Sequence, residues 1–300
     1  MDRRHAHQTR EGYCYALAAY GMWGLVPLYF KAIQSVPPLE VLAHRIVWSV
    51  FSLAALLTCF RTWPMLVGCL RQPRRVAGFL VTALLIAANW YGFIYGVEVN
   101  EVKQASLGYY ITPLVSVALG VTLLRESLRR LQIVALVLAG AGVAILMWRM
   151  GRVPWIAFTL AGSFGLYGLI RKQLRVDGLV GLSLETIFLA PLALAYLGLI
   201  HAQGALSLAQ GDAGRDTLLI ASGIVTALPL MCFGQAAQRL PLIALGFLQY
   251  LSPTIQMVLA LSVFGEQTLP LEGLVLVWVA LLIFTLEALY QAKRASVPSV

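Results

Sequence analysis

Three ionisable side chains lie deep inside long apolar runs of the sequence. His44 and Arg45 lie in the run 39–60, and Glu185 lies in the run 179–200. A charge near the middle of a bilayer costs about 2.5–3.5 kcal/mol on insertion scales, so each group should face the interior of a helix bundle and have a partner there. Guanidinium and imidazole groups attract anionic or polar solutes, whereas imidazole and carboxylate groups can exchange protons. We therefore expect a substrate site, with Glu185 and His44 as candidates for proton coupling; a fixed ion pair is the alternative.

Amide and aromatic side chains occur in the neighbouring apolar runs. An amide in hydrocarbon needs a hydrogen-bond partner, and aromatic faces suit flat or cationic ligands. Each of these side chains could alternatively serve only the packing of helices against one another. The candidate substrate-binding and translocation residues are therefore His44, Arg45, Glu185, Trp23, Asn89, Trp90, Tyr110, Gln235, Gln249 and Tyr250.

Motifs of soluble enzymes and of ATP-driven pumps do not occur in the sequence. It contains no G-x-x-x-x-G-K-[ST] motif, no H-E-x-x-H motif and no cluster of cysteine and histidine with metal-ligand spacing. We therefore expect no catalytic residues, no cofactor, no metal and no ATPase subunit. Two alternatives stay open: an integral-membrane enzyme that uses Glu185 and His44 as acid and base, and a channel.

The composition predicts which kind of fold positions these residues. Hydrophobic residues make up 60% of the 300 residues and charged residues 12%, against about 45–50% and 25% in soluble domains. A soluble fold could not hide so much apolar surface, and a disordered chain would be far more polar. The apolar runs are continuous and lack the alternation of a β-barrel. The sequence therefore predicts an all-α integral membrane protein.

Charged and Gly/Pro-containing connections divide the chain into ten apolar runs. A spanning helix needs about 20 such residues, and ten would use roughly two thirds of the chain. We predict membrane-spanning helices over residues 13–30, 39–60, 76–97, 105–124, 131–148, 154–170, 179–200, 217–238, 242–264 and 272–290.

Lysine and arginine are distributed unequally between the two ends of these predicted helices. Sixteen of the 22 lie on the side of the N-terminus, five lie on the other side, and Arg45 lies within a span. Because basic connections stay in the cytoplasm, both termini are predicted to be cytoplasmic. The same distribution accounts for the net charge of +9, since the basic residues face anionic lipid. The lipid bilayer, and not nucleic acid, is therefore the expected partner.

The two halves of the sequence resemble each other. A shift of 140 residues places Tyr110 on Tyr250 and Pro113 on Pro253. The repeat unit would comprise five helices, over residues 1–150 and 151–300. Because five is an odd number, the second unit would enter the membrane from the opposite side, as in the inverted repeats of many secondary transporters. The same shift places Arg45 on Glu185, so these two charges could meet in one cavity or lie near opposite ends of the protein.

Several strings of residues resemble the EamA branch of the drug/metabolite transporter superfamily over nearly the whole chain. The resemblance implies a fold of ten helices in two inverted five-helix repeats. It also implies a transporter of the bacterial inner membrane for small organic molecules, such as amino-acid-like metabolites or drugs. Thr112 stands where the family carries asparagine, and no substrate residue is carried over from the family. The strings begin at His44-Arg45-Ile46, Asn89-Trp90, Ala105-Ser106-Leu107-Gly108-Tyr109-Tyr110, Tyr167-Gly168-Leu169 and Leu245-Gly246-Phe247.

These observations together predict a secondary transporter that works by alternating access around a cavity at the membrane midplane. His44 and Arg45 would attract an anionic or polar group of the substrate. The aromatic residues would stack on its organic body, and the amides would fix its orientation. The aromatic residues of this prediction are Trp23, Trp90, Tyr110 and Tyr250, and the amides are Asn89, Gln235 and Gln249.

Overall fold

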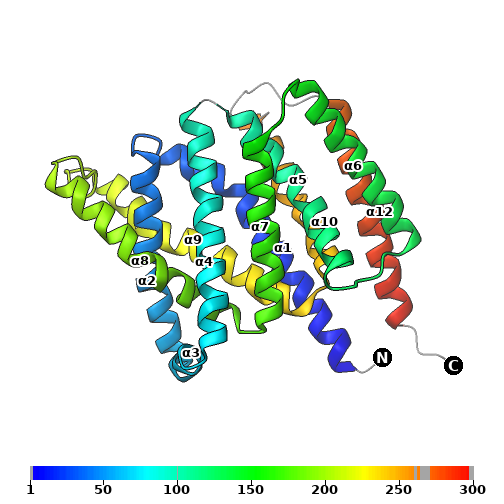
Figure 1. Cartoon of the computed structure of the whole chain (residues 1–300), viewed down its shortest axis with the longest axis horizontal. Helices are drawn as coiled ribbons and strands as arrows, with labels where there is room; N and C mark the ends of the chain where they lie inside the picture. The colour runs from blue at the N-terminus through cyan, green and yellow to red at the C-terminus, as the bar shows by residue number, and fades with distance from the viewer. Residues whose placement is uncertain (1–2, 100, 260–261, 264–270, 297–300) are drawn as a thin grey trace.

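The computed structural model describes residues 3–99, 101–259, 262–263 and 271–296, and no β-strand occurs among them (Figure 1). Each predicted span overlaps a long helical segment, so the predicted all-α fold is confirmed for these residues. Seven helical segments in the described ranges are long and apolar enough to cross a membrane: α2, α4, α5, α6, α8, α9 and the pair α10–α11. The helices are α1 (Arg3–Ala32), α2 (Pro38–Cys59), α3 (Trp63–Leu70), α4 (Pro73–Glu98), α5 (Val102–Thr122), α6 (Arg130–Met150), α7 (Trp155–Leu174), α8 (Gly178–Ala202), α9 (Ala213–Arg239), α10 (Leu242–Gln249), α11 (Leu251–Leu259) and α12 (Leu271–Ser296).

The structure adds two features to the predicted spans. The short helix α3 forms in the connection that follows α2, where no helix was predicted. The predicted span 242–264 is broken at Tyr250, between α10 and α11. Pro253 explains this break, because proline has no N–H group to donate to the carbonyl of Gln249, four residues earlier.

Local signals in the sequence account for several helix ends. Pro38 stands at the first position of α2, where its fixed φ suits a helix start. The Asp177 carboxylate accepts a hydrogen bond from the N–H of Leu179 at 2.9 Å and caps α8. Gly151 ends α6 in the left-handed conformation, with φ of 69°. These caps place the connections at the two ends of the bundle.

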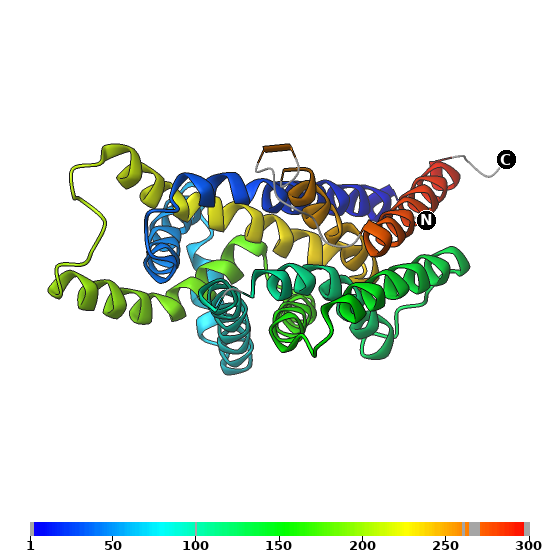
Figure 2. The ribbon, with the colours of Figure 1, turned by 90° about the horizontal axis from the view of Figure 1, so that it is seen from above.

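Seen from above, the helices form two rows (Figure 2). One row contains α1, α9, α11 and α12, and the other contains α4, α5, α6 and α7. α1 begins and α12 ends on the side of the molecule that carries α3 (Figure 1). We call this side the α3 face, and the side that carries the α1–α2 connection the opposite face.

Glycines allow close helix crossings within each row. A Cβ atom on Gly24 would lie 2.7 Å from Cβ of Ile255, and one on Gly165 would lie 2.6 Å from Cγ1 of Val115. These positions join α1 to α11 in one row and α7 to α5 in the other. In hydrocarbon the hydrophobic effect does not drive helices together, so close approach and dispersion contacts must hold the bundle.

Candidate functional site

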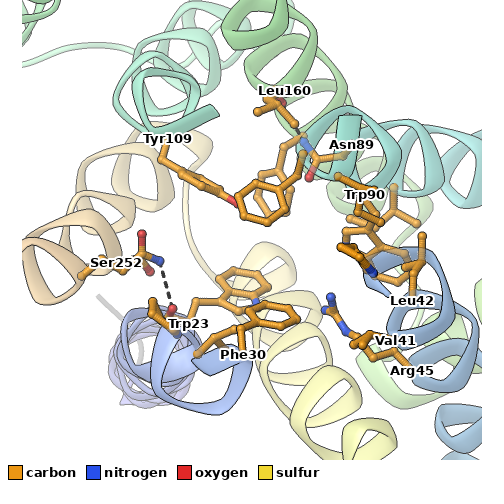
Figure 3. A pocket seen from close by; sticks show the side chains of 18 of the residues that line it. Trp23, Phe30, Val41, Leu42, Arg45, Asn89, Trp90, Tyr109, Leu160 and Ser252 are labelled. Atoms are coloured by element: carbon orange, nitrogen blue, oxygen red, sulfur yellow. Dashed lines mark hydrogen bonds between the residues drawn. The ribbon is translucent and has the colours of Figure 1, made fainter. Parts of the chain in front are cut away.

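A cavity of about 750 Å³ lies between the two rows of helices (Figure 3). Small-molecule sites typically have volumes of about 300–1,000 Å³. Residues of α1, α2, α9, α10 and α11 line one side of the cavity, and residues of α4, α5 and α7 line the other. The predicted site residues that line it are Trp23, Arg45, Asn89, Trp90 and Gln249, and further aromatic side chains come from Phe30, Phe93, Tyr109 and Phe164.

The cavity reaches the molecular surface at the α1–α2 connection. Lys31, Gln34 and Pro38 line it there and are exposed. Phe93 and Ile94, near the end of α4, line the same region. The mouth of the cavity therefore lies on the face opposite α3.

The carboxylate of Glu101, just before α5 and at the same face, forms an ion pair with Arg152. Arg152 donates a hydrogen bond to Glu101, and this bond holds the pKa of the Glu101 carboxyl below its usual value. Glu101 is thus ionised at neutral pH and already paired. It does not line the cavity.

The Arg45 guanidinium is held firmly in the cavity wall. Its Nε donates a hydrogen bond to Thr226 Oγ1 at 2.8 Å, which joins α2 to α9. Its Cζ lies 5.3 Å from the ring centre of Phe30 and 5.3 Å from that of Trp90. Contacts with two aromatic rings and the hydrogen bond to Thr226 hold the group in place, and Figure 3 shows its terminal nitrogens directed toward the space of the cavity.

Two amides of the cavity differ in how their hydrogen bonds are used. Asn89 Nδ2 donates to the Leu160 carbonyl at 2.9 Å and to Ser163 Oγ at 3.1 Å, so its donors join α4 to α7. The Gln249 side chain makes no hydrogen bond within the part of the chain that the structure describes. Asn89 therefore offers an acceptor to a ligand, and Gln249 offers both a donor and an acceptor.

A proline in α1 explains one polar contact beside the cavity. Pro27 cannot donate to the carbonyl of Trp23, and Gln256 Nε2 donates to that carbonyl instead, at 3.1 Å. A neighbouring helix thus satisfies the carbonyl that this proline leaves free. Trp23 is thereby fixed at the cavity wall by a contact from α11.

Five predicted residues do not line the cavity, and four of them make contacts between helices or connections. Tyr110 and Tyr250 face each other with ring centres 6.5 Å apart, and the Tyr250 hydroxyl donates to the Tyr110 carbonyl at 3.2 Å. Gln235 donates a hydrogen bond to Asp177 in the turn before α8. His44 is buried, and its Nε2 lies 3.7 Å from Glu40 Oε1.

Glu185 lies in a buried polar cluster away from the cavity lining. Its Oε1 accepts a hydrogen bond from Thr82 at 2.7 Å, and its Oε2 accepts one from Tyr167 at 3.1 Å. Arg171 Nη1 lies 3.7 Å from Oε1, and both charged side chains are 1% exposed. Of the two arrangements left open for Glu185 and Arg45, the structure favours separate positions, because Arg171 supplies the positive charge beside Glu185. The geometry supports the alternative of a fixed ion pair.

Arg171 was not predicted, although it is the partner of Glu185. The predicted span 154–170 ended one residue before it, and Arg171 was counted among the basic residues of a connection. Two glycines make room for its guanidinium: a Cβ on Gly181 would lie 1.7 Å from Nη1, and one on Gly234 would lie 2.5 Å from Nη2. Its spacing from Tyr167 is the one signal that could have found it, because residues four apart share one face of a helix.

Ion pairs and hydrogen bonds join helix ends at the α3 face. The Glu126 carboxylate accepts hydrogen bonds from the N–H groups of Leu242 and Ile243, at 2.8 and 2.9 Å, where α10 begins. Lys172 Nζ lies 3.9 Å from Glu126, and it also donates to the Leu240 carbonyl.

A second ion pair lies at the same end of the bundle. Arg239 Nε lies 3.4 Å from Glu11 Oε2, which joins the end of α9 to α1. We call the ion pairs Glu126–Lys172 and Glu11–Arg239, together with the hydrogen bonds that join Glu126 and Lys172 to residues 240–243, the α3-face seal. The cavity thus has its mouth at one face, and the seal lies at the other.

Comparisons with known proteins agree with this architecture. The model of the EamA-like transporter family matches residues 10–148. The chain belongs to the EamA-like transporter family. Protein RarD of Escherichia coli (strain K12) is 42% identical, over 97% of this chain and 99% of that protein. The uncharacterized transporter YojE of Bacillus subtilis (strain 168) is 41% identical over 98% and 99%.

A more distant relative and a solved structure extend the comparison. The chloramphenicol-sensitive protein RarD of Pseudomonas aeruginosa is 31% identical over 91% of this chain and 93% of that protein. One crystal structure has the same fold, with a TM-score of 0.71 and 18% identity, and covers 92% of this chain and 98% of that one. The chain is therefore a RarD-type EamA transporter, a multi-pass protein of the inner membrane.

Proposed function

We propose that this transporter is a secondary carrier of small organic molecules that works by alternating access around the cavity. The observation that carries the proposal is the one-sidedness of the cavity. It reaches the surface at the α1–α2 connection, and the seal of ion pairs lies at the α3 face. A carrier must have such a state, since it exposes its binding site to one side at a time.

The same proposal includes ten spans in two inverted five-helix units, over residues 1–150 and 151–300. Two close crossings support it: Gly24 meets Ile255, and Gly165 meets Val115. Val115 and Ile255 are separated by the shift of 140 residues, so corresponding helices make corresponding contacts in the two units. The excess of basic residues at the α3 face supports cytoplasmic termini. The cavity would then open away from the cytoplasm.

A transport cycle follows from this arrangement. A substrate enters through the mouth and binds between the two rows of helices. Closing of the rows around it removes water and breaks the hydrogen bonds that join Glu126 and Lys172 to residues 240–243 in the α3-face seal, so that the cavity opens to the cytoplasm. Ion pairs suit such a seal because each is partly exposed and so contributes only modest stability. Its opening therefore needs little of the free energy of substrate binding.

The two alternative functions have less support. A channel would need a continuous pore, whereas the seal lies at one end of this cavity. An enzyme that uses Glu185 and His44 would need both at one reaction site, but Glu185 bonds to Thr82 and Tyr167 whereas His44 faces Glu40. Neither residue lines the cavity.

Flux into proteoliposomes tests the proposed function. We expect one or more members of a panel of radiolabelled metabolites and drugs, chloramphenicol included, to show saturable flux and exchange, and to leave the vesicles chemically unchanged. Each compound is measured with and without a pH gradient, against empty liposomes as the control. Flux that does not saturate would indicate a channel, and a chemically altered product would indicate an enzyme.

A further inference from the structure

We infer that the cavity selects organic anions, and that the two terminal nitrogens of Arg45 bind the carboxylate of the substrate. This inference rests on the proposed carrier function and names its substrate class: a flat or aromatic apolar body that carries one carboxylate.

The edge of the Arg45 guanidinium that carries Nη1 and Nη2 is available to a ligand. The hydrogen bond to Thr226 occupies Nε, and the rings of Phe30 and Trp90 each lie with their centre 5.3 Å from Cζ. The edge that carries Nη1 and Nη2 is directed toward the space of the cavity (Figure 3). Two parallel N–H donors at this edge fit the two oxygens of a carboxylate.

The charged residues that line the cavity, in the part of the chain that the structure describes, are basic. Arg45 and Lys31 line it, and no aspartate or glutamate does so in the part of the chain that the structure describes. The nearby carboxylates are engaged elsewhere. Glu101 accepts from Arg152, and the buried Glu40 accepts from the N–H and Oγ of Ser207 at 2.6 and 2.8 Å. The ammonium group of a cationic or zwitterionic solute would therefore have no counterion in the wall.

Aromatic side chains in the cavity wall suit the apolar body of the solute. Trp23 and Phe164 meet edge to face with ring centres 5.6 Å apart, and Tyr109 lies across the cavity from Trp23 and Phe30 (Figure 3). Offset and edge-to-face contacts between rings are favourable beyond the area they bury. The unpaired Gln249 amide adds a polar group that can orient the body of the solute.

The carboxylate also explains how binding could drive the transport cycle. When the mouth is open, water can solvate the Arg45 charge. Closing of the cavity removes this water, and a buried charge without a counterion is strongly unfavourable. An anion supplies the missing charge, whereas a neutral solute of the same shape does not. Because a ligand shifts a conformational equilibrium only by its differential affinity, anions should favour the closed form.

A matched set of probes tests this inference. The probes are 3-phenylpropanoate, its neutral amide 3-phenylpropanamide, the cation 3-phenylpropylamine and zwitterionic phenylalanine. Binding to the full-length protein in nanodiscs is measured by tryptophan fluorescence and calorimetry, and flux is measured in proteoliposomes. We expect the wild type to bind the anion at least about tenfold more tightly than the amide, because charge-assisted bidentate hydrogen bonds are the strong ones.

Variants assign the preference to Arg45. Arg45→Gln should remove the preference for the anion over the amide, and Arg45→Lys should retain part of it. Arg149→Gln is the matched control, because Arg149 is an exposed residue that pairs with Glu272 at 3.2 Å outside the cavity. It should bind like the wild type. Equal thermal stability and elution volume would show that a loss of binding is not a loss of folding.

The outcomes separate this inference from the proposed function. Anion binding no tighter than amide binding in the wild type, or an unchanged preference in Arg45→Gln, would overturn the inference. Saturable flux of the amine or the amide in the same experiment would leave the carrier function intact. An anion preference that depends on Arg45, without saturable flux of any compound, would support the anion site and contradict the carrier function.

Discussion

Replacing Arg171 with alanine should destabilise the protein by about 3–5 kcal/mol, because it would leave Glu185 buried and charged without its counterion. Glu185 is 1% exposed, and its two oxygens keep only the hydrogen bonds from Thr82 and Tyr167. Those two neutral donors cannot replace a full positive charge. Reversible unfolding in mixed micelles measures the free energy of unfolding of each variant.

The double variant Arg171→Met with Glu185→Gln distinguishes an unpaired charge from lost packing. Methionine fills much of the space of the apolar part of the arginine side chain. The Oε1 atom of the glutamine can still accept a hydrogen bond from Thr82. The double variant should therefore recover most of the lost stability, as replacement of other buried ion pairs has done. Arg149→Ala is the control for a surface pair and should change stability by less than about 1 kcal/mol. An Arg171→Ala variant as stable as this control would contradict the buried pair.

The variant Glu185→Gln also tests the proposed coupling of a proton to this residue. If the pair is a fixed structural contact, a folded Glu185→Gln protein should retain pH-driven flux. Loss of pH-driven flux together with retained exchange of substrate at equal pH would instead assign coupling to Glu185.

Replacing Gly223 with alanine should be the second strongly disruptive change, with a destabilisation of about 1–3 kcal/mol or more. A Cβ atom at this position would lie 2.3 Å from the carbonyl carbon of Trp48 and 2.7 Å from the N of Ser49. These are backbone atoms, so α2 and α9 would have to separate. Separation would also break the hydrogen bond from Ser49 Oγ to the Gly223 carbonyl, 3.1 Å long.

The same change should weaken substrate binding. Arg45 and Thr226 lie about one helical turn from this crossing, and their hydrogen bond fixes the guanidinium. Gly162→Ala is the matched control, since a Cβ placed there meets nothing within 4 Å apart from its chain neighbours and the nearby backbone of its own helix. Because alanine favours helix over glycine, the control should be neutral or slightly stabilised. Stability measurements on both variants test the prediction, and equal effects would contradict the close crossing.

The sequence predicted the helices better than it predicted which helix faces meet. Continuous apolar runs determine helices, because backbone groups in lipid must bond within their own segment. The direction in which a single side chain points depends on the rotation of its helix about the helix axis, and adjacent side chains point in directions about 100° apart. Tyr109 and Tyr110 show the consequence: Tyr109 lines the cavity, whereas the predicted Tyr110 packs against Tyr250.

The charged residues show the same limit. Arg45 was found because a charge within an apolar run is rare, and it lines the cavity. Arg171 was missed because it lies where α7 ends, among residues that resemble an ordinary basic connection. Its burial depends on space beside Gly181 of α8 and Gly234 of α9, whereas Arg171 itself lies on α7. Such tertiary accommodation leaves no local pattern in the sequence.

Accessibility of one cysteine from the two faces tests the central claim most directly. Ser252→Cys places a thiol at the cavity wall, in a protein whose four native cysteines, Cys14, Cys59, Cys69 and Cys232, are replaced. A small membrane-impermeant thiol reagent is then added to one side of oriented vesicles at a time. In the intact protein we expect labelling mainly from the face that carries the α1–α2 connection. Removing both ion pairs of the α3-face seal, by Glu126→Ala with Arg239→Ala, should lower that labelling and raise labelling from the α3 face. Labelling that rises from both faces together, or a thiol that neither face can reach, would contradict a single cavity with alternating access.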